Sequence, residues 1–218
     1  MNLKNSSSLQ RVLNIWGIVL IIWIIYRKKL SLPEWFDEII AKPFVFILPT
    51  YLYIKRFEKK PYFDQIWLKS KNIGSDIVLG VILGLIFSAS AIIANYVRYG
   101  SFDFIAKLIS QNLIFAVIIT IFTATSEEVL SRGFILKRLY DDSKNMYSAV
   151  FLNSILFLIL HFPILLSNSK LSGSLILLFL GTDFILSLVN SFVFIERKSL
   201  LAPILIHALY NISILLYV

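Results

Sequence analysis

The chain has 218 residues, of which 58% are hydrophobic and 16% charged, and its mean hydropathy is +0.80. A soluble domain is about 45–50% apolar and about 25% charged, so one soluble core of this size could not hide so much apolar surface. The absence of cysteine excludes disulfides, thiolate metal sites and cysteine nucleophiles. The net charge of +8 comes from basic residues between apolar runs, which favours membrane lipids over nucleic acid as partners.

The fold class that follows is all-α, a polytopic bundle of transmembrane helices. A span needs about 20 apolar residues. We predict about seven spans, within a range of six to eight, at residues 12–26, 39–54, 73–97, 105–126, 146–166, 173–195 and 200–218. The second run contains Lys42, Pro43 and Pro49, so it could instead be re-entrant or interfacial.

The distribution of basic residues predicts the orientation of the bundle. Fourteen of the 21 Lys and Arg residues fall in the N-terminus and in the loops after spans two, four and six, with Arg132 and Arg138 assigned to the loop after span four. The positive-inside rule then places the N-terminus in the cytoplasm of a multi-pass cell-membrane protein. The richness in isoleucine, lysine and asparagine indicates an AT-rich bacterial genome.

Ionisable residues at membrane depth are costly, and they usually have a function. Those inside or at the ends of apolar runs, together with one amide, are Glu127, Glu128, Arg132, His161, Asp183, His207 and Asn211. All of them lie in the second half of the chain. This distribution divides the chain into N-terminal helices with a polar loop, residues 1–104, and a helical core, residues 105–218, which carries all of these residues and whose last four helices we expect to form the site cavity.

The first cluster ends a run of about twenty apolar and small residues. Glu128 and Arg132 are four residues apart, so they can pair on one helix face. Adjacent residues on a helix point about 100° apart, which leaves Glu127 directed elsewhere and free to act as a base. The alternative is that these charges mark only the end of a helix.

The only two histidines of the chain both lie in apolar runs. His161 precedes Pro163 and could simply bond a carbonyl at a helix end. His207 and Asn211 are four residues apart, so both project toward one point, as the donors of an oxyanion hole must. They could equally be an interhelical hydrogen-bond pair. Asp183 receives no role; it could be a structural partner or lie at a helix break near Gly181.

In order and spacing, these residues resemble the motifs of the CAAX prenyl protease and bacteriocin-processing family of intramembrane peptidases, also called CPBP or Abi. The motifs read Glu127-Glu128-x-x-x-Arg132, Phe157-x-x-x-His161 and His207-x-x-x-Asn211. Gly133 and the stretch from Ser199 to Pro203 also agree, whereas Ser131 replaces an aromatic residue that is frequent in the family. The resemblance covers about residues 108–218.

The resemblance implies a role for each residue. Glu127 and His161 would bind and activate water, His207 and Asn211 would stabilise the oxyanion, and Glu128 and Arg132 would orient the others. This mechanism needs no cofactor. Zinc or another divalent metal is the alternative, with Glu127, His161 and His207 as the three protein ligands that a catalytic zinc usually takes.

The favoured function is therefore an intramembrane endopeptidase that acts on a peptide or protein at the membrane. By family analogy, bacteriocin processing or self-immunity is its role, because prenylated substrates are not expected in a bacterium. A non-catalytic membrane scaffold or immunity protein with the same fold is the first alternative. A proton-relay transporter is the second, and it would require an inverted repeat that the sequence does not show.

Overall fold

The computed structural model describes residues 7–30, 32–68, 70–100, 113–163 and 174–215, and within these ranges it is helical without strands. This confirms the all-α prediction. Short π-helical segments, Asp37–Ala41, Ile54–Glu58 and Val129–Leu136, extend several helices. The α-helices are α1 Ser8–Lys29, α2 Glu34–Phe36, α3 Lys42–Tyr53, α4 Tyr62–Gln65, α5 Ile73–Tyr99, α7 Leu113–Glu128, α8 Lys137–Ser143, α9 Met146–Leu160, α11 Ser174–Arg197 and α12 Leu201–Leu215.

Four helical stretches in the described residues are long and apolar enough to cross a membrane. They are Ser8–Lys29, Ile73–Ile93, Leu113–Ser143 and Phe179–Arg197, and α9 and α12 are shorter apolar helices. This confirms a polytopic bundle. The predicted second span, 39–54, is helical but is not among these stretches. Parts of four other predicted spans, residues 105–112, 164–166, 173 and 216–218, lie outside the described residues.

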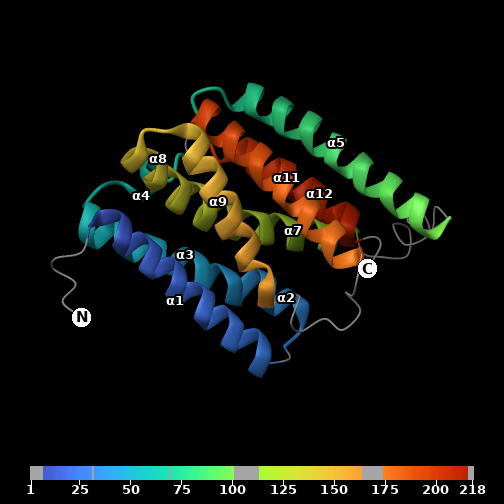
Figure 1. Cartoon of the computed structure of the whole chain (residues 1–218), viewed down its shortest axis with the longest axis horizontal. Helices are drawn as coiled ribbons and strands as arrows, with labels where there is room; N and C mark the ends of the chain where they lie inside the picture. The colour runs from blue at the N-terminus through green and yellow to red at the C-terminus, as the bar shows by residue number, and fades with distance from the viewer. Residues whose placement is uncertain (1–6, 31, 69, 101–112, 164–173, 216–218) are drawn as a thin grey trace.

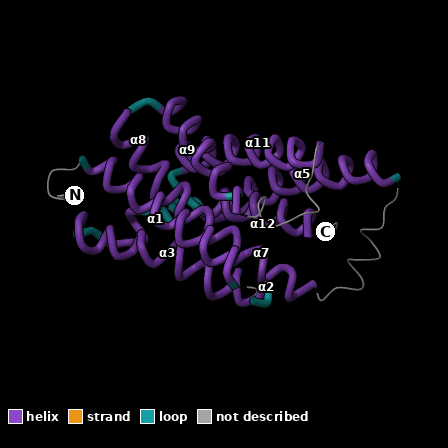
Figure 2. The backbone as a smooth tube through the Cα atoms, turned by 60° about the horizontal axis from the view of Figure 1, so that its bottom comes forward, coloured by secondary structure: helices purple, strands orange, loops and turns teal. Residues whose placement is uncertain are grey.

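The helices are arranged around α7. Figure 1 shows α1 and α3 side by side along one edge and α5 along the opposite edge, next to α12. Figure 2 shows the same neighbours from another direction. Helix α7 contacts both α3 and α12, so it joins the N-terminal helices to the C-terminal ones.

The sequence interpretation was wrong about where α7 ends. The helix continues through the π-helical segment Val129–Leu136 into α8, and all eight residues of that segment are buried. The two buried arginines of this continuous helix each have a partner. Arg132 bonds Glu128, and Arg138 of α8 bonds Glu58 at 2.9 and 3.0 Å. Arg132 and Arg138 are therefore not loop residues.

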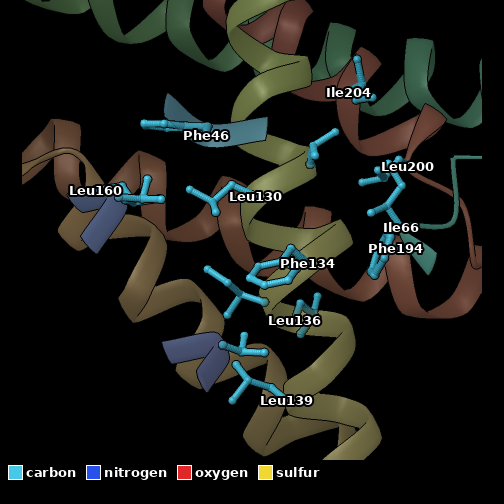
Figure 3. Close-up of a cluster of buried hydrophobic side chains, with 14 of the residues drawn as sticks. Phe46, Ile66, Leu130, Phe134, Leu136, Leu139, Leu160, Phe194, Leu200 and Ile204 are labelled. Carbon is cyan, nitrogen blue, oxygen red and sulfur yellow. The ribbon is translucent and has the colours of Figure 1, made fainter. Parts of the chain in front are cut away.

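One hydrophobic core joins the two halves of the chain. Figure 3 shows Phe134 at the centre of this cluster, with Phe46 of α3, Leu130 and Leu160 nearby. Phe46, Leu130 and Phe134 are at most 1% exposed, and Val12 and Val19 of α1 belong to the same cluster. The N-terminal helices therefore pack directly against the helices that carry the predicted site residues.

Glycines of α5 allow a close approach to α12, the helix that carries His207. A Cβ at Gly80 would lie 2.8 Å from Leu205 Cβ and 3.1 Å from the backbone of Ala202. One turn later, a Cβ at Gly84 would lie 2.6 Å from Leu209 Cδ1. Ser88 extends this row and donates a hydrogen bond to the Leu209 carbonyl at 2.9 Å. Small residues at such a spacing are typical of helix contacts in membranes.

We expect Gly80→Val to destabilise the protein by about 1–3 kcal/mol, because the new side chain meets the backbone of α12. Gly74→Val is the matched control on the same helix, since nothing lies within 4 Å of a Cβ there. Thermal unfolding of the purified protein in detergent measures both variants. Equal melting temperatures for the two would contradict the close α5–α12 contact.

Candidate active site

The pair Glu128–Arg132 forms as the spacing predicted, and it is completely buried. Arg132 Nη1 donates to Glu128 Oε1 at 3.0 Å, and both side chains are 0% exposed. Arg132 also donates to the hydroxyl and carbonyl of Ser187, at 2.9 and 3.2 Å, and its guanidinium lies 4.3 Å from the centre of the Phe157 ring. The arginine therefore ties α7 to α11 as well as compensating the buried carboxylate.

Glu128 holds three helices together through one oxygen. Its Oε1 accepts hydrogen bonds from Arg132, from Asn190 Nδ2 at 3.1 Å and from His207 Nδ1 at 2.8 Å. Asn190 belongs to α11 and His207 to α12. Because Oε1 accepts all three bonds, Glu128 is suited to fixing the His207 ring, while its Oε2 is buried without a hydrogen-bond partner among the described residues.

Glu127 points away from Glu128, as predicted, but it is not free. Its Oε1 accepts a hydrogen bond from Lys42 Nζ at 2.9 Å. Its Oε2 is buried without a hydrogen-bond partner among the described residues, and it faces His161 Nε2 and His207 Nε2, each 3.7 Å away. Such distances are too long for direct hydrogen bonds. Three polar atoms from α7, α9 and α12 thus converge around one small space.

The hydrogen bonds of the two imidazoles define which nitrogen carries the proton. His161 Nδ1 lies 3.0 Å from the Phe157 carbonyl oxygen, which can only accept, so Nδ1 must be the donor. His207 Nδ1 lies 2.8 Å from Glu128, and an ionised carboxylate likewise only accepts. In neutral imidazoles both Nε2 atoms therefore present a lone pair to the space beside Glu127. This hydrogen bond to the Phe157 carbonyl is also the one expected if His161 were only a structural residue at a helix end.

A small cavity lies against this cluster. Its volume is about 20 Å³, and Glu38, Lys42, Glu127 and His161 line it together with Trp23, Arg27, Phe46 and Leu160. A volume above about 10–15 Å³ can hold one water molecule if polar partners are present. The lone pairs of Glu127 and His161 are such partners, so the cavity suits a water held next to the carboxylate.

Two polar residues of α11 belong to the site although the sequence interpretation gave them no role. Asp183 is 3% exposed, and its Oδ2, which has no hydrogen-bond partner in the described part of the chain, lies 3.7 Å from His161 Nε2. Asn190 bonds Glu128. A helix break near Gly181, one of the two alternatives considered for Asp183, does not occur, since α11 runs through that position. Both residues were visible in the sequence as polar positions at membrane depth, which was the signal that could have assigned them.

Lys42 was missed completely, because it was treated as a charge within a doubtful second span. It is 5% exposed, on the first turn of α3, and it bonds both Glu127 and Glu38. The site therefore takes a residue from the N-terminal half, in addition to the last four helices.

Asn211 follows His207 by one turn on α12 and is half-buried. Within the described part of the chain it makes no hydrogen bond to the other five predicted residues. Its role as a second oxyanion donor stays a prediction.

The alternative metal set of Glu127, His161 and His207 does not fit the observed geometry. Among the described residues, no group of three His, Cys, Asp or Glu side chains is arranged to hold a metal ion. The Lys42 ammonium would also repel a divalent cation at Glu127. We therefore derive no chemical step through a metal, and metal dependence stays a prediction for experiment.

Residues 109–213 match the family model described as Rce1-like, type II CAAX prenyl endopeptidase Rce1-like. The matched part of the chain is Rce1-like. This confirms the resemblance drawn from the motifs, and the match includes all six predicted site residues, from Glu127 to Asn211. Lys42 lies outside the Rce1-like part. No curated protein and no solved structure matches the chain significantly. The match of this part to a peptidase family model and the apolar helices together suggest a peptidase of the membrane.

Proposed function

We propose that the chain is an intramembrane endopeptidase that hydrolyses a peptide bond of a membrane-associated peptide or protein. One observation carries the proposal: the buried Oε2 of Glu127, which has no hydrogen-bond partner among the described residues, faces Nε2 of His161 and Nε2 of His207, each 3.7 Å away, beside a cavity of water size. A buried carboxylate and histidines around a space for water are the groups that general-base hydrolysis requires.

In the proposed reaction, water donates one hydrogen bond to Glu127 Oε2 and the other to His161 Nε2. The water oxygen attacks the peptide carbonyl carbon while Glu127 takes the water proton that it binds. When the C–N bond of the tetrahedral intermediate breaks, Glu127 returns that proton to the leaving amine. General-base help of this kind contributes about 10²–10⁴-fold in rate.

His207 is placed to stabilise the negative charge on the carbonyl oxygen. Since its Nδ1 proton is held by Glu128, the ring can donate from Nε2 only in its imidazolium form. Asn211, one turn later, would supply the second donor. A preorganised donor to an oxyanion contributes about 10²–10³-fold in kcat.

The substrate class follows from the surroundings of the site. Apolar side chains such as Ile21 and Ile82 are 58% and 53% exposed on the outer faces of the helices, so a substrate anchored in the bilayer reaches the protein most directly. With the N-terminus in the cytoplasm, a cytoplasmic tail would be presented to Glu127. Bacteriocin processing or self-immunity remains a prediction supported by the family resemblance alone.

The experiment is cleavage of a library of membrane-tethered peptides by the purified protein, with His161→Gln and His207→Gln as variants and with or without a chelator. We expect wild-type cleavage to survive the chelator, and each histidine variant to lose at least about 10²-fold in kcat. Loss of wild-type activity in the chelator, restored by zinc, would overturn the metal-free mechanism.

A complete absence of cleavage by wild type would overturn the peptidase proposal itself. In that case a cellular phenotype that persists in both histidine variants would establish the non-catalytic scaffold in its place.

A further inference from the structure

An ion-pair network connects the N-terminal half of the chain to the site. Lys42 bonds Glu127 Oε1 at 2.9 Å and forms an ion pair with Glu38, which in turn accepts a hydrogen bond from Thr123 Oγ1 at 2.7 Å. Each of these four side chains touches the next. Glu38, Lys42 and Glu127 are at most 9% exposed, so the network is shielded from water.

The network has a matching spacing on both of its helices. Thr123 and Glu127 are one turn apart on α7, and Glu38 and Lys42 are one turn apart on the helix that runs from the π-helical segment into α3. Residues four apart share a helix face. Two contacts, Thr123–Glu38 and Glu127–Lys42, therefore fix the axial register of α3 against α7 directly at the proposed catalytic carboxylate.

Lys42 also determines how the two oxygens of Glu127 are used. Because the ammonium holds Oε1, the rotation of the carboxylate is fixed and Oε2 is turned toward the two imidazoles. Without Lys42, both oxygens would be unpartnered in a buried space, and the carboxylate could rotate away from the water position.

We propose that Lys42 is a positioning residue of the active site, supplied by a helix outside the Rce1-like part, and that it aims Glu127 Oε2 at the attacking water. This inference rests on the proposed peptidase function. It assigns a role in the reaction to the N-terminal half of the chain. Misplacement of a reacting group by about 1 Å can cost about 10²-fold in rate, so the expected effect is on kcat.

A simple Lys42→Met variant would leave two buried carboxylates without a cation and could fail to fold. The test variant is therefore Lys42→Met combined with Glu38→Gln, which keeps the net charge of the cluster while Glu127 loses its partner. The matched control is Arg138→Met combined with Glu58→Gln. This pair also joins the two halves of the chain, at 2.9 Å, and neither of its residues lines the cavity beside Glu127.

We expect the Lys42/Glu38 variant to lose about 10–100-fold in kcat with KM changed less than about twofold. The Arg138/Glu58 control should stay within about twofold of wild type, and Lys42→Arg should recover part of the loss because it keeps a donor cation. In a Glu127→Gln background, the Lys42/Glu38 changes should have no further effect, since the carboxylate that they position is gone.

Three results would overturn the inference while leaving the peptidase function intact. The first is a kcat for the Lys42/Glu38 variant equal to or above that of wild type. The second is an equal loss in the Arg138/Glu58 control. The third is the same fractional loss with or without Glu127. A wild-type protein that cleaves nothing would instead refute the peptidase function, and the inference would fall with it.

Discussion

Replacing Glu127 with glutamine should lower kcat for peptide cleavage by about 10²–10⁴-fold, the share that a general base contributes. Glutamine keeps the size of the side chain and an oxygen that accepts a hydrogen bond from Lys42. The network therefore loses only the negative charge of residue 127. The amide cannot take a proton from water at the position where Oε2 faces His161 and His207. Single-turnover cleavage of a tethered peptide measures the effect on chemistry apart from binding.

Two controls make this result specific. Glu196→Gln is the same chemical change at an exposed position near the end of α11, and it should leave cleavage unchanged. The melting temperature of Glu127→Gln should remain close to that of wild type, which separates lost chemistry from lost structure. Full activity of a folded Glu127→Gln protein would exclude Glu127 as the base.

The second large effect is on stability. Arg132→Met should lower the free energy of unfolding by about 3–5 kcal/mol, because it leaves Glu128 charged and buried without its cation. For a chain of this size the melting temperature should fall by about 6–20 °C. The double variant Glu128→Gln/Arg132→Met removes the stranded charge as well, so it should recover much of the loss.

The matched control is Lys137→Met on α8. Lys137 and Asp141 are also four residues apart, at 2.8 Å, but Asp141 is 49% exposed. Because Asp141 stays in contact with solvent, removing Lys137 strands no charge in the interior, and pairs four residues apart on a helix contribute about 0.3–0.5 kcal/mol. If Arg132→Met melts at the same temperature as Lys137→Met, the Glu128–Arg132 pair does not contribute as a buried pair should.

The parts of the site that the sequence predicted are those determined by local geometry. The spacing of Glu128 and Arg132 is enough to place them on one helix face, and the observed bond confirms that pairing. The two histidines stand out because ionisable residues are rare in apolar runs. Both rules use only neighbours in the sequence or the composition of a single helix.

The parts that the sequence did not predict depend on how separate helices pack. Lys42 and Glu127 are 85 residues apart, and no local pattern relates them. The continuation of α7 beyond Glu128 was missed for a similar reason. In the sequence, a run of charges is typical of a helix end. The charges lie inside the protein because Arg132 bonds a residue of α11 and Arg138 bonds a residue of the segment after α3.

The shared oxygen of Glu128 has a consequence for how the protein opens. Because this atom is bonded by groups from α7, α11 and α12, none of the three helices can separate without exposing a buried charge to hydrocarbon. Local fluctuations near the site are therefore coupled. The three helices should form one cooperative unit whose amides exchange with solvent together, while parts of the chain without such a link open independently.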